Sequence, residues 1–389
     1  MKQILFIGQD ASKTGAPFVL LHLMRWLKQN APEYHIELLL LAGGELEEEF
    51  RKVCSVHVLY RQISGSGIGA VVEKSIRYLR KKLGGGNRLI SRLASKHSLV
   101  LGNTAVTLEH LTLFKRRGNQ TILWMHELDY AVDHFFLREQ FLEMAELMDG
   151  FIVGSNAVHE MLLRRGVTRP VEVVYEFLNT AEVPARSRVD IRSELDIPAD
   201  AFVVGACGTI EWRKGIDLFV QVAKRSVKES PNIYFIWVGG RYPGTDTAYD
   251  QIQFDVRKLG LEKRIIFVDI EHDLYEYYQV MDVFLLPSRE DPFPLVCLEA
   301  AAFEKPILCF ENAGGMPEFV EEDAGFVVPY LDVEVMCQRV AQLHDDPQLL
   351  SQLGQVAANK VRNRHDVSQG GAEILKIVDG FHARKGWEF

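Results

Sequence analysis

Residues 282–310 read DVFLLPSREDPFPLVCLEAAAFEKPILCF, and this stretch decides the fold. It opens on a short apolar run, DVFLLP, that is typical of a buried strand. A turn of charged residues and prolines follows, and then a segment that predicts a helix ending at Pro306. A second apolar run, ILCF, comes directly after that proline. Strand, helix and strand in this order predict one unit of a parallel sheet with helices packed on its faces.

The N-terminal half repeats the same alternation. Apolar runs that predict buried strands lie at residues 4–8, 36–42, 56–60, 98–102, 121–125, 150–153 and 171–175. A polar stretch with two prolines, residues 180–200, then precedes the strand that begins a second α/β unit. We therefore expect an α/β protein with one domain at 1–179, a linker at 180–200 and a second domain at 201–369. The final segment, 370–389, predicts a helix.

Composition narrows the function classes. The chain has 389 residues and a formal net charge of −9, which argues against a general nucleic-acid binder. Its five cysteines form no C-x-x-C pair, so we expect reduced core thiols rather than disulfides or a metal site. No apolar run approaches the ~20 residues of a membrane span, and the first residues do not form a signal peptide. These features predict a cytoplasmic protein.

The central stretch also predicts a phosphate site. Prolines at the start of its helix leave the first backbone amides, those of Leu295 and Val296, without acceptors inside the helix. These donors and the positive end of the helix dipole bind phosphate oxygens well. Two acids, Asp291 and Glu299, lie eight residues apart, one before the helix and one about two turns into it. Their carboxylates would accept hydrogen bonds from sugar hydroxyls.

This stretch resembles the E-x-x-x-x-x-x-x-E signature of family 4 retaining glycosyltransferases, whose bacterial members read REDPFPLVxLEAxAxxKP. In that family the second acid, here Glu299, holds the ribose of a sugar nucleotide. The first acid and the adjoining amides hold the donor sugar and the distal phosphate. Asp291 stands at the first position where Glu is commoner, with Glu290 beside it, and the resemblance leaves open which of the two contacts the sugar. Phe293 and Pro294 complete the implied donor loop.

The resemblance implies the GT-B fold, in which two Rossmann-like domains face each other across a cleft and the last helix crosses back to the first domain. It also implies a diphosphate contact in GTIEWRKGID, where Lys214 and a glycine precede a helix. Relatives read G-R-x-x-x-x-K-G in this segment. Lys214 matches directly, Thr209 stands where the Arg is expected, and Arg213 is a candidate to replace it. Val268 and Asp269, at the end of a later strand, are implied to line the base pocket.

The N-terminal domain supplies further candidates at the carboxyl ends of its strands. Gly15 and Ala16, in the first loop, allow a close approach of backbone to donor or acceptor, although a simple turn explains them as well. His126 ends the strand TILWM, where relatives place a histidine against the donor sugar; a core or surface role is the alternative. Asn103 is an acceptor-side candidate, and Ser155 is expected to cap the following helix.

Residues 74–97 contain eight Lys and Arg and no acid, with apolar residues interleaved. This pattern suits an amphipathic segment on anionic lipid or on a lipid-linked acceptor, and it equally suits a solvated helical face.

The resemblance implies a retaining glycosyltransferase that moves a hexose, with UDP-glucose as the expected donor, to a glycan or lipid-linked acceptor in bacterial polysaccharide synthesis, at the inner face of the plasma membrane. A GDP-mannose donor is the alternative. From other classes, a sugar-nucleotide epimerase and a non-catalytic donor-binding subunit remain open. No Asp-x-Asp triplet is present in the sequence, so we expect neither a metal nor another cofactor. The leaving diphosphate would instead be stabilised by Lys214 and the helix amides.

Overall fold

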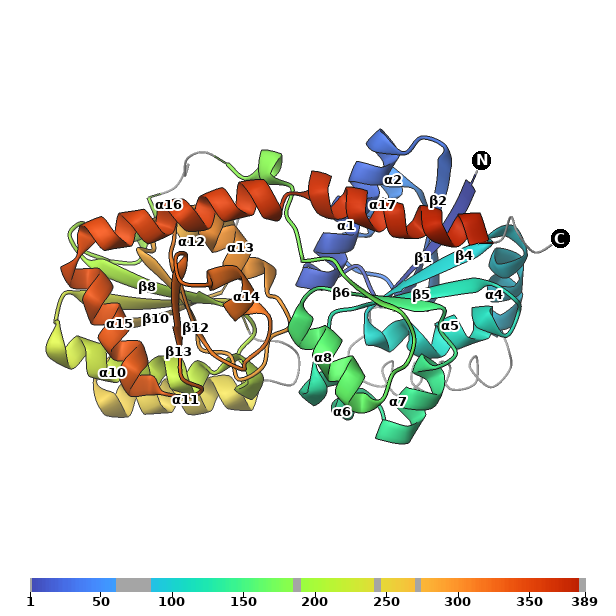
Figure 1. Ribbon diagram of the computed structural model, residues 1–389. Coiled ribbons are helices and arrows are strands. Elements are labelled where there is room, and N and C mark those ends of the chain that lie inside the picture. The colour runs from blue at the N-terminus through green and yellow to red at the C-terminus, as the bar shows by residue number, and fades with distance from the viewer. Residues whose placement is uncertain (1, 61–84, 185–189, 241–245, 270–273, 385–389) are drawn as a thin grey trace. The chain divides into compact units, whose positions relative to one another are not determined.

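The computed structural model describes residues 2–60, 85–184, 190–240, 246–269 and 274–384 (Figure 1). The chain divides into two compact units. Unit 1 is formed by Met1–Tyr175 together with Val367–Phe389, and unit 2 by Glu176–Asp366. These divisions lie a few residues before the predicted boundaries at 179 and 369.

Unit 1 alternates strands and helices along most of its length. Its strands are β1 (Lys2–Gly8), β2 (Tyr34–Ala42), β3 (Ser55–Tyr60), β4 (Leu99–Asn103), β5 (Gln120–Met125), β6 (Gly150–Val153) and β7 (Val171–Val173). Its helices are α1 (Gly15–Asn30), α2 (Glu47–Val53), α4 (Gly85–Lys96), α5 (Leu108–Lys115), α6 (Asp129–Phe135), α7 (Arg138–Ala145), α8 (Asn156–Arg165) and α17 (Val367–Arg384). All predicted strands of this half are present, and Ser155 caps α8 as predicted, by accepting from the amide of Val158.

Among the described residues of unit 1 the strands form one seven-stranded sheet in the order β3-β2-β1-β4-β5-β6-β7. Every pairing is parallel. The strands read as continuous apolar runs because helices cover both faces of the sheet. This is the doubly wound arrangement expected from the sequence.

The last helix, α17, packs on unit 1, as the resemblance implied. It lies along α1, where Gly371 faces the indole of Trp26; a Cβ at position 371 would stand 2.7 Å from that ring. Near the end of α17, Asp379 forms an ion pair with Lys2 and accepts a hydrogen bond from Tyr34. The C-terminal helix is therefore part of the first unit (Figure 1).

Unit 2 contains the second sheet. Its strands are β8 (Phe202–Cys207), β9 (Ile233–Val238), β10 (Ile265–Val268), β11 (Val283–Leu286), β12 (Ile307–Phe310) and β13 (Gly325–Val328). Its helices are α9 (Ile191–Glu194), α10 (Ile216–Glu229), α11 (Asp246–Leu259), α12 (Leu274–Val280), α13 (Leu295–Ala302), α14 (Met316–Val320), α15 (Val333–Asp345) and α16 (Pro347–Arg364). In the described part of this unit the strands form a six-stranded parallel sheet in the order β10-β9-β8-β11-β12-β13.

The segment predicted as a linker, 180–200, belongs to unit 2. Thr180 donates from its amide and its hydroxyl to Asp366, and Arg192 donates to the carbonyl of Val280 at 3.1 Å. These bonds attach the described residues of the segment to the unit. Polar composition alone does not reveal them.

The central helix is shorter than predicted. α13 ends at Ala302 rather than at Pro306, because the chain turns through Phe303 and through Glu304, whose φ is +60°. Pro306 leads directly into β12.

Candidate functional site

The strand order of unit 2 reverses between β8 and β11, and ligands of such sheets bind at this switch point, outside the carboxyl ends of the strands. The loop after β8 runs from Gly208 to the start of α10. The loop after β11 runs from Pro287 to the start of α13. Both predicted donor-binding loops therefore flank the switch point.

An ion pair joins the two loops. Lys214 Nζ lies 2.6 Å from Asp291 Oδ2, and the two side chains are 16% and 7% exposed. The hydroxyl of Ser288 also donates to Asp291 Oδ2, at 3.2 Å. Burial raises the pKa of Asp291, but Lys214, Arg213 and Ser288 outweigh it, and the net effect lowers the pKa below its ordinary value. Asp291 is therefore a fixed anion that orients Lys214.

Arg213 lies beside this pair. Its guanidinium donates to Glu211 Oε1 and to the carbonyl of Glu290, both at 2.9 Å, and stands 3.8 Å from Asp291 Oδ1. Arg213, the second cation of the loop, thus lies next to Lys214. A residue that replaces the Arg expected at position 209 would have to lie there. The side chain of Glu290 is less buried than that of Asp291.

Two glycines let the loops approach closely. Gly215 has φ +73°, and a Cβ there would stand 1.9 Å from the carbonyl oxygen of Pro287. Gly314 has φ +138°, and its Cβ would stand 1.7 Å from the carbonyl oxygen of Asp291. The amide of Asp291 donates to the carbonyl of Ala313 at 2.7 Å. Because only glycine fits at both places, the two positions fix where the acid lies.

The amino end of α13 completes this edge of the sheet. Pro294 is the N-cap residue, and Cys297 is the first helix residue whose amide donates back to its carbonyl, at 3.1 Å. The amides of Leu295 and Val296 precede that bond and point out of the helix end. Phe293 is only 4% exposed and stacks on His365 with ring centroids 5.4 Å apart. Phe293 would therefore contribute to a ligand site through its backbone.

Glu299 lies further along α13 and is half-buried. Its Oε2 accepts a hydrogen bond of 2.7 Å from the hydroxyl of Tyr278 on α12. Val268 ends β10, and its carbonyl accepts from the amide of Gly239; Asp269 is exposed. The implied base-binding residues thus stand at the carboxyl end of the same sheet.

Unit 1 has its own switch point, between β1 and β4. Asn103, the last residue of β4, donates to the carbonyl of Ala16 at 3.1 Å and contacts His126 Nε2 through its Oδ1, at 2.8 Å. Gly15 begins α1 and is exposed. Two predicted residues, Ala16 and His126, are therefore linked through Asn103.

This network sets the tautomer of His126. Asn103 uses its amide nitrogen as donor to Ala16, so its Oδ1 is an acceptor and His126 Nε2 carries the proton. The carboxylate of Glu127 accepts from the amides of His126 at 3.0 Å and of Ala105 at 2.9 Å. The histidine is thereby held on both its backbone and its ring.

The predicted basic segment, 74–97, falls partly outside the described residues, which begin again at 85. In its described part α4 buries Ile90 and Leu93, which are 3% and 2% exposed, in the core of unit 1. Arg88 and Arg92 are exposed. For α4 this arrangement favours the solvated helical face, because the apolar side chains are already packed against protein.

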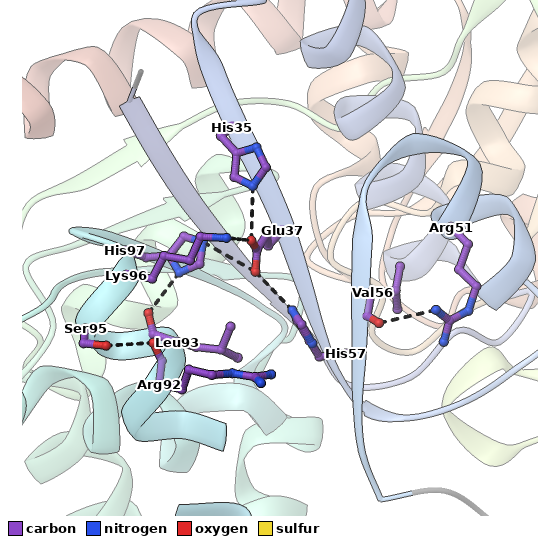
Figure 2. Close-up of polar contacts among 10 residues, drawn as sticks. All are labelled: His35, Glu37, Arg51, Val56, His57, Arg92, Leu93, Ser95, Lys96 and His97. Atoms are coloured by element: carbon purple, nitrogen blue, oxygen red, sulfur yellow. Dashed lines mark hydrogen bonds and ion pairs between the residues drawn. The ribbon is translucent and has the colours of Figure 1, made fainter. Parts of the chain in front are cut away.

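Unit 1 also contains a buried carboxylate, Glu37, that was not predicted from the sequence. Glu37 on β2 is bonded to His35 Nε2 at 3.1 Å and His57 Nε2 at 3.0 Å, and it forms an ion pair with Lys96 (Figure 2). His97 Nε2 lies 3.9 Å away. The donors approach the carboxylate from several sides, and among the described residues no three His, Cys, Asp or Glu side chains are arranged to hold a metal ion.

Three contributors to these clusters were missed from the sequence. Ser288 follows β11 directly, so the strand-end rule could have identified it. Tyr278 lies inside a helix and Glu37 inside a strand, and no local pattern marks either residue as a partner of a distant side chain.

Within the described residues, no helix is both long and apolar enough to cross a membrane.

This chain is similar to known sugar-transferring enzymes. The family model described as glycosyl transferases group 1 matches residues 187–360. Alpha-galactosylglucosyldiacylglycerol synthase of Streptococcus pneumoniae is 26% identical over 264 residues, which cover 64% of this chain and 69% of that protein. Lipopolysaccharide core biosynthesis mannosyltransferase LpsB of Rhizobium meliloti is 32% identical over 153 residues, 38% of this chain and 43% of that protein.

A solved structure is similar over nearly the whole chain. The crystal structure of Anabaena Alr3699/HepE in complex with UDP and glucose superimposes with a TM-score of 0.81. The match covers 97% of this chain and 100% of that chain at 20% sequence identity. At this identity the likeness establishes the fold.

Proposed function

Because this chain belongs to the glycosyl transferases group 1 family and has the GT-B fold, we propose that it transfers a hexose from a nucleotide-diphosphate sugar to a glycan or lipid-linked acceptor. The observation that carries the proposal is the cation at the switch point of unit 2. Lys214 is held by Asp291 beside the amino end of α13. A fixed cation next to orphan helix amides is suited to a diphosphate.

The proposed donor is UDP-glucose. The similar Anabaena structure contains UDP and glucose, which supports this choice. GDP-mannose is the second candidate, because the Rhizobium relative is a mannosyltransferase. Val268 and Asp269 would meet the base mainly through backbone groups, so side chains give little discrimination between uracil and guanine.

The proposed mechanism retains the anomeric configuration and requires no metal. Lys214, Arg213 and the amides of Leu295 and Val296 would stabilise the charge that develops on the leaving diphosphate. Glu299 would bind the ribose. Attack from the face that the diphosphate leaves would let that diphosphate take the proton of the acceptor. Treatment with EDTA should leave the rate unchanged, and a loss restored by a divalent cation would contradict this part of the proposal.

Two acids compete for the sugar contact. Asp291 has one oxygen engaged with Lys214 and Ser288, whereas Glu290 is less buried. His126, whose Nε2 is bonded to Asn103, is proposed to hydrogen-bond the transferred sugar through Nδ1, which accepts from a sugar hydroxyl in this tautomer. Comparing Asp291→Asn with Glu290→Gln for the turnover of a glucose donor and of a mannose donor would assign the contact, since only the residue that touches the sugar should alter the ratio of the two rates.

The proposed acceptor class follows from the names of the relatives, which include a glycolipid synthase and a lipopolysaccharide enzyme. Synthesis of a surface polysaccharide or glycolipid at the inner face of the plasma membrane is the corresponding role. The predicted contact of segment 74–97 with anionic lipid stays part of the proposal for its basic residues 74–84, which lie outside the described residues, since α4 already packs its apolar side chains against protein. Co-sedimentation with vesicles of phosphatidylglycerol, but not with vesicles of phosphatidylcholine, would support this contact. Failure to bind either kind of vesicle would refute it.

The decisive experiment incubates the purified chain with UDP-, GDP- and ADP-sugars and follows the slow release of free sugar. Release from one donor supports the transferase. A changed sugar that stays linked to its nucleotide would indicate an epimerase instead, and no reaction with any donor would indicate a binding subunit. Lys214→Ala serves as the matched inactive control.

A further inference from the structure

Tyr278 lies beneath the candidate donor site. It is a residue of α12, its side chain is fully buried, and its ring packs against Phe284 and Phe303 with centroids 6.1 and 6.0 Å apart. A phenol in such apolar surroundings needs an acceptor for its O–H. The packing fixes the ring, so the position of the hydroxyl is fixed as well.

The acceptor is the carboxylate of Glu299. The hydroxyl of Tyr278 donates to Glu299 Oε2 at 2.7 Å, a short bond to a charged group of the kind that contributes most among side-chain hydrogen bonds. Cys207, the last residue of β8, lies close to both side chains. Residues from β8, α12 and α13 thus meet at one point at the carboxyl end of the sheet.

We propose that Tyr278 is a positioning residue for the donor, whose hydroxyl holds the Glu299 carboxylate in the orientation that binds the ribose hydroxyls of a nucleoside diphosphate. The inference rests on the proposed function, in which Glu299 contacts the ribose. A glutamate side chain has several rotatable bonds, and fixing them costs free energy when a ligand binds. A rigid tyrosine removes that cost in advance because it holds the carboxylate before the nucleotide arrives.

The electrostatics keep Tyr278 in the donor role. Burial, and next the neighbouring charge of Glu299, raise the pKa of Tyr278 well above its ordinary value. The phenol therefore stays protonated, and the bond keeps its direction throughout the neutral range.

The experiment separates this role from simple core packing. The full-length wild type, Tyr278→Phe, Glu299→Gln and the double variant are titrated calorimetrically with UDP and GDP. The nucleotide that the wild type binds more tightly is then compared with its 2′,3′-dideoxy analogue. We expect Tyr278→Phe to weaken the ribonucleotide about tenfold and the dideoxy analogue less than twofold. In the Glu299→Gln background the same change should add nothing.

A control variant and a second test variant separate the loss of the Tyr278–Glu299 bond from a general effect on folding. Tyr234→Phe removes the hydroxyl of another buried tyrosine, one under the guanidinium of Arg264 near the start of β9, and should leave both affinities unchanged. Glu299→Asp withdraws the carboxylate from Tyr278 by one methylene, leaves the core intact, and should reproduce the ribose-specific loss even where Tyr278→Phe folds poorly.

The outcomes distinguish failure of the positioning role of Tyr278 from failure of the proposed transferase function. Equal losses for the ribonucleotide and its dideoxy analogue, or additive losses in the double variant, would overturn the positioning role while leaving the transferase intact. Full ribonucleotide affinity in Glu299→Asp would do the same. If the wild type binds no nucleoside diphosphate, the proposed function fails and this inference fails with it.

Discussion

Asp291 in unit 2 and Glu37 in unit 1 are both buried carboxylates paired with a lysine, and their side chains are 7% and 5% exposed. They differ in their position in the sheet. Asp291 follows the carboxyl end of β11, beside the amino end of a helix, whereas Glu37 lies within β2, five residues before that strand ends. Ligands of parallel sheets bind at carboxyl ends. We therefore predict that position in the sheet, more than burial or charge pairing, separates a candidate site from a structural ion cluster.

The largest expected difference between the two clusters is in catalysis. Lys214→Ala should lower the rate of sugar release from the donor by about 100-fold or more, because it removes a preorganised cation from the leaving diphosphate. Lys96→Ala, which removes the lysine of the Glu37 cluster, should leave the rate of the folded protein within about twofold. Steady-state assays of both variants with the same donor check this. Similar losses of rate in the two variants would contradict the prediction that only the Lys214–Asp291 cluster takes part in catalysis.

The second expected difference is in stability. Glu37→Gln should lower the free energy of unfolding by about 2 kcal/mol, because His35, His57 and Lys96 lose the charged acceptor that they share. Its specific activity should remain that of the wild type. Urea unfolding followed by circular dichroism, with activity measured on the same samples, tests both statements. A variant of unchanged stability and lost activity would make Glu37 part of the active site.

The stabilisation by Glu37 should also depend on pH. Burial raises the pKa of Glu37, but bonds from Lys96, His57 and His35 outweigh it and lower the pKa from 4.5 to about 2. Because the unfolded chain then binds a proton more readily than the folded one, the stabilisation is complete above pH 4.5 and is lost as the pH falls toward 2. The difference in unfolding free energy between wild type and Glu37→Gln should shrink over this range. A constant difference would show that Glu37 is not charged in the folded protein.

The smallest effect is expected at Ser288. Ser288→Ala removes one neutral donor from Asp291, about 1 kcal/mol, and should slow sugar release no more than about fivefold. The matched control is Ser95→Ala on α4, near the Glu37 cluster, whose hydroxyl bonds only to the carbonyl of Arg92 among the contacts drawn in Figure 2. It should leave the rate unchanged. A loss of 100-fold at Ser288 would mean that its hydroxyl contacts substrate directly.

The sequence predicted most of the fold, because buried parallel strands appear as uninterrupted apolar runs between helical patterns. It also placed Lys214, Asp291 and Glu299 on loops and a helix at one sheet edge. It overestimated the length of α13, because residues 303–305 keep a helix-like composition although the backbone turns at Glu304. The Lys214–Asp291 ion pair and the Tyr278–Glu299 hydrogen bond join residues distant in sequence. Such contacts depend on tertiary packing, which no local pattern encodes.

The central claim is that the amino end of α13 and Lys214 bind the diphosphate of an activated sugar. A crystal structure of the full chain with UDP or GDP tests it most directly. We expect phosphate oxygens within hydrogen-bonding distance of the amides of Leu295 and Val296 and of Lys214 Nζ, with the ribose at Glu299. A diphosphate bound away from these groups would contradict it.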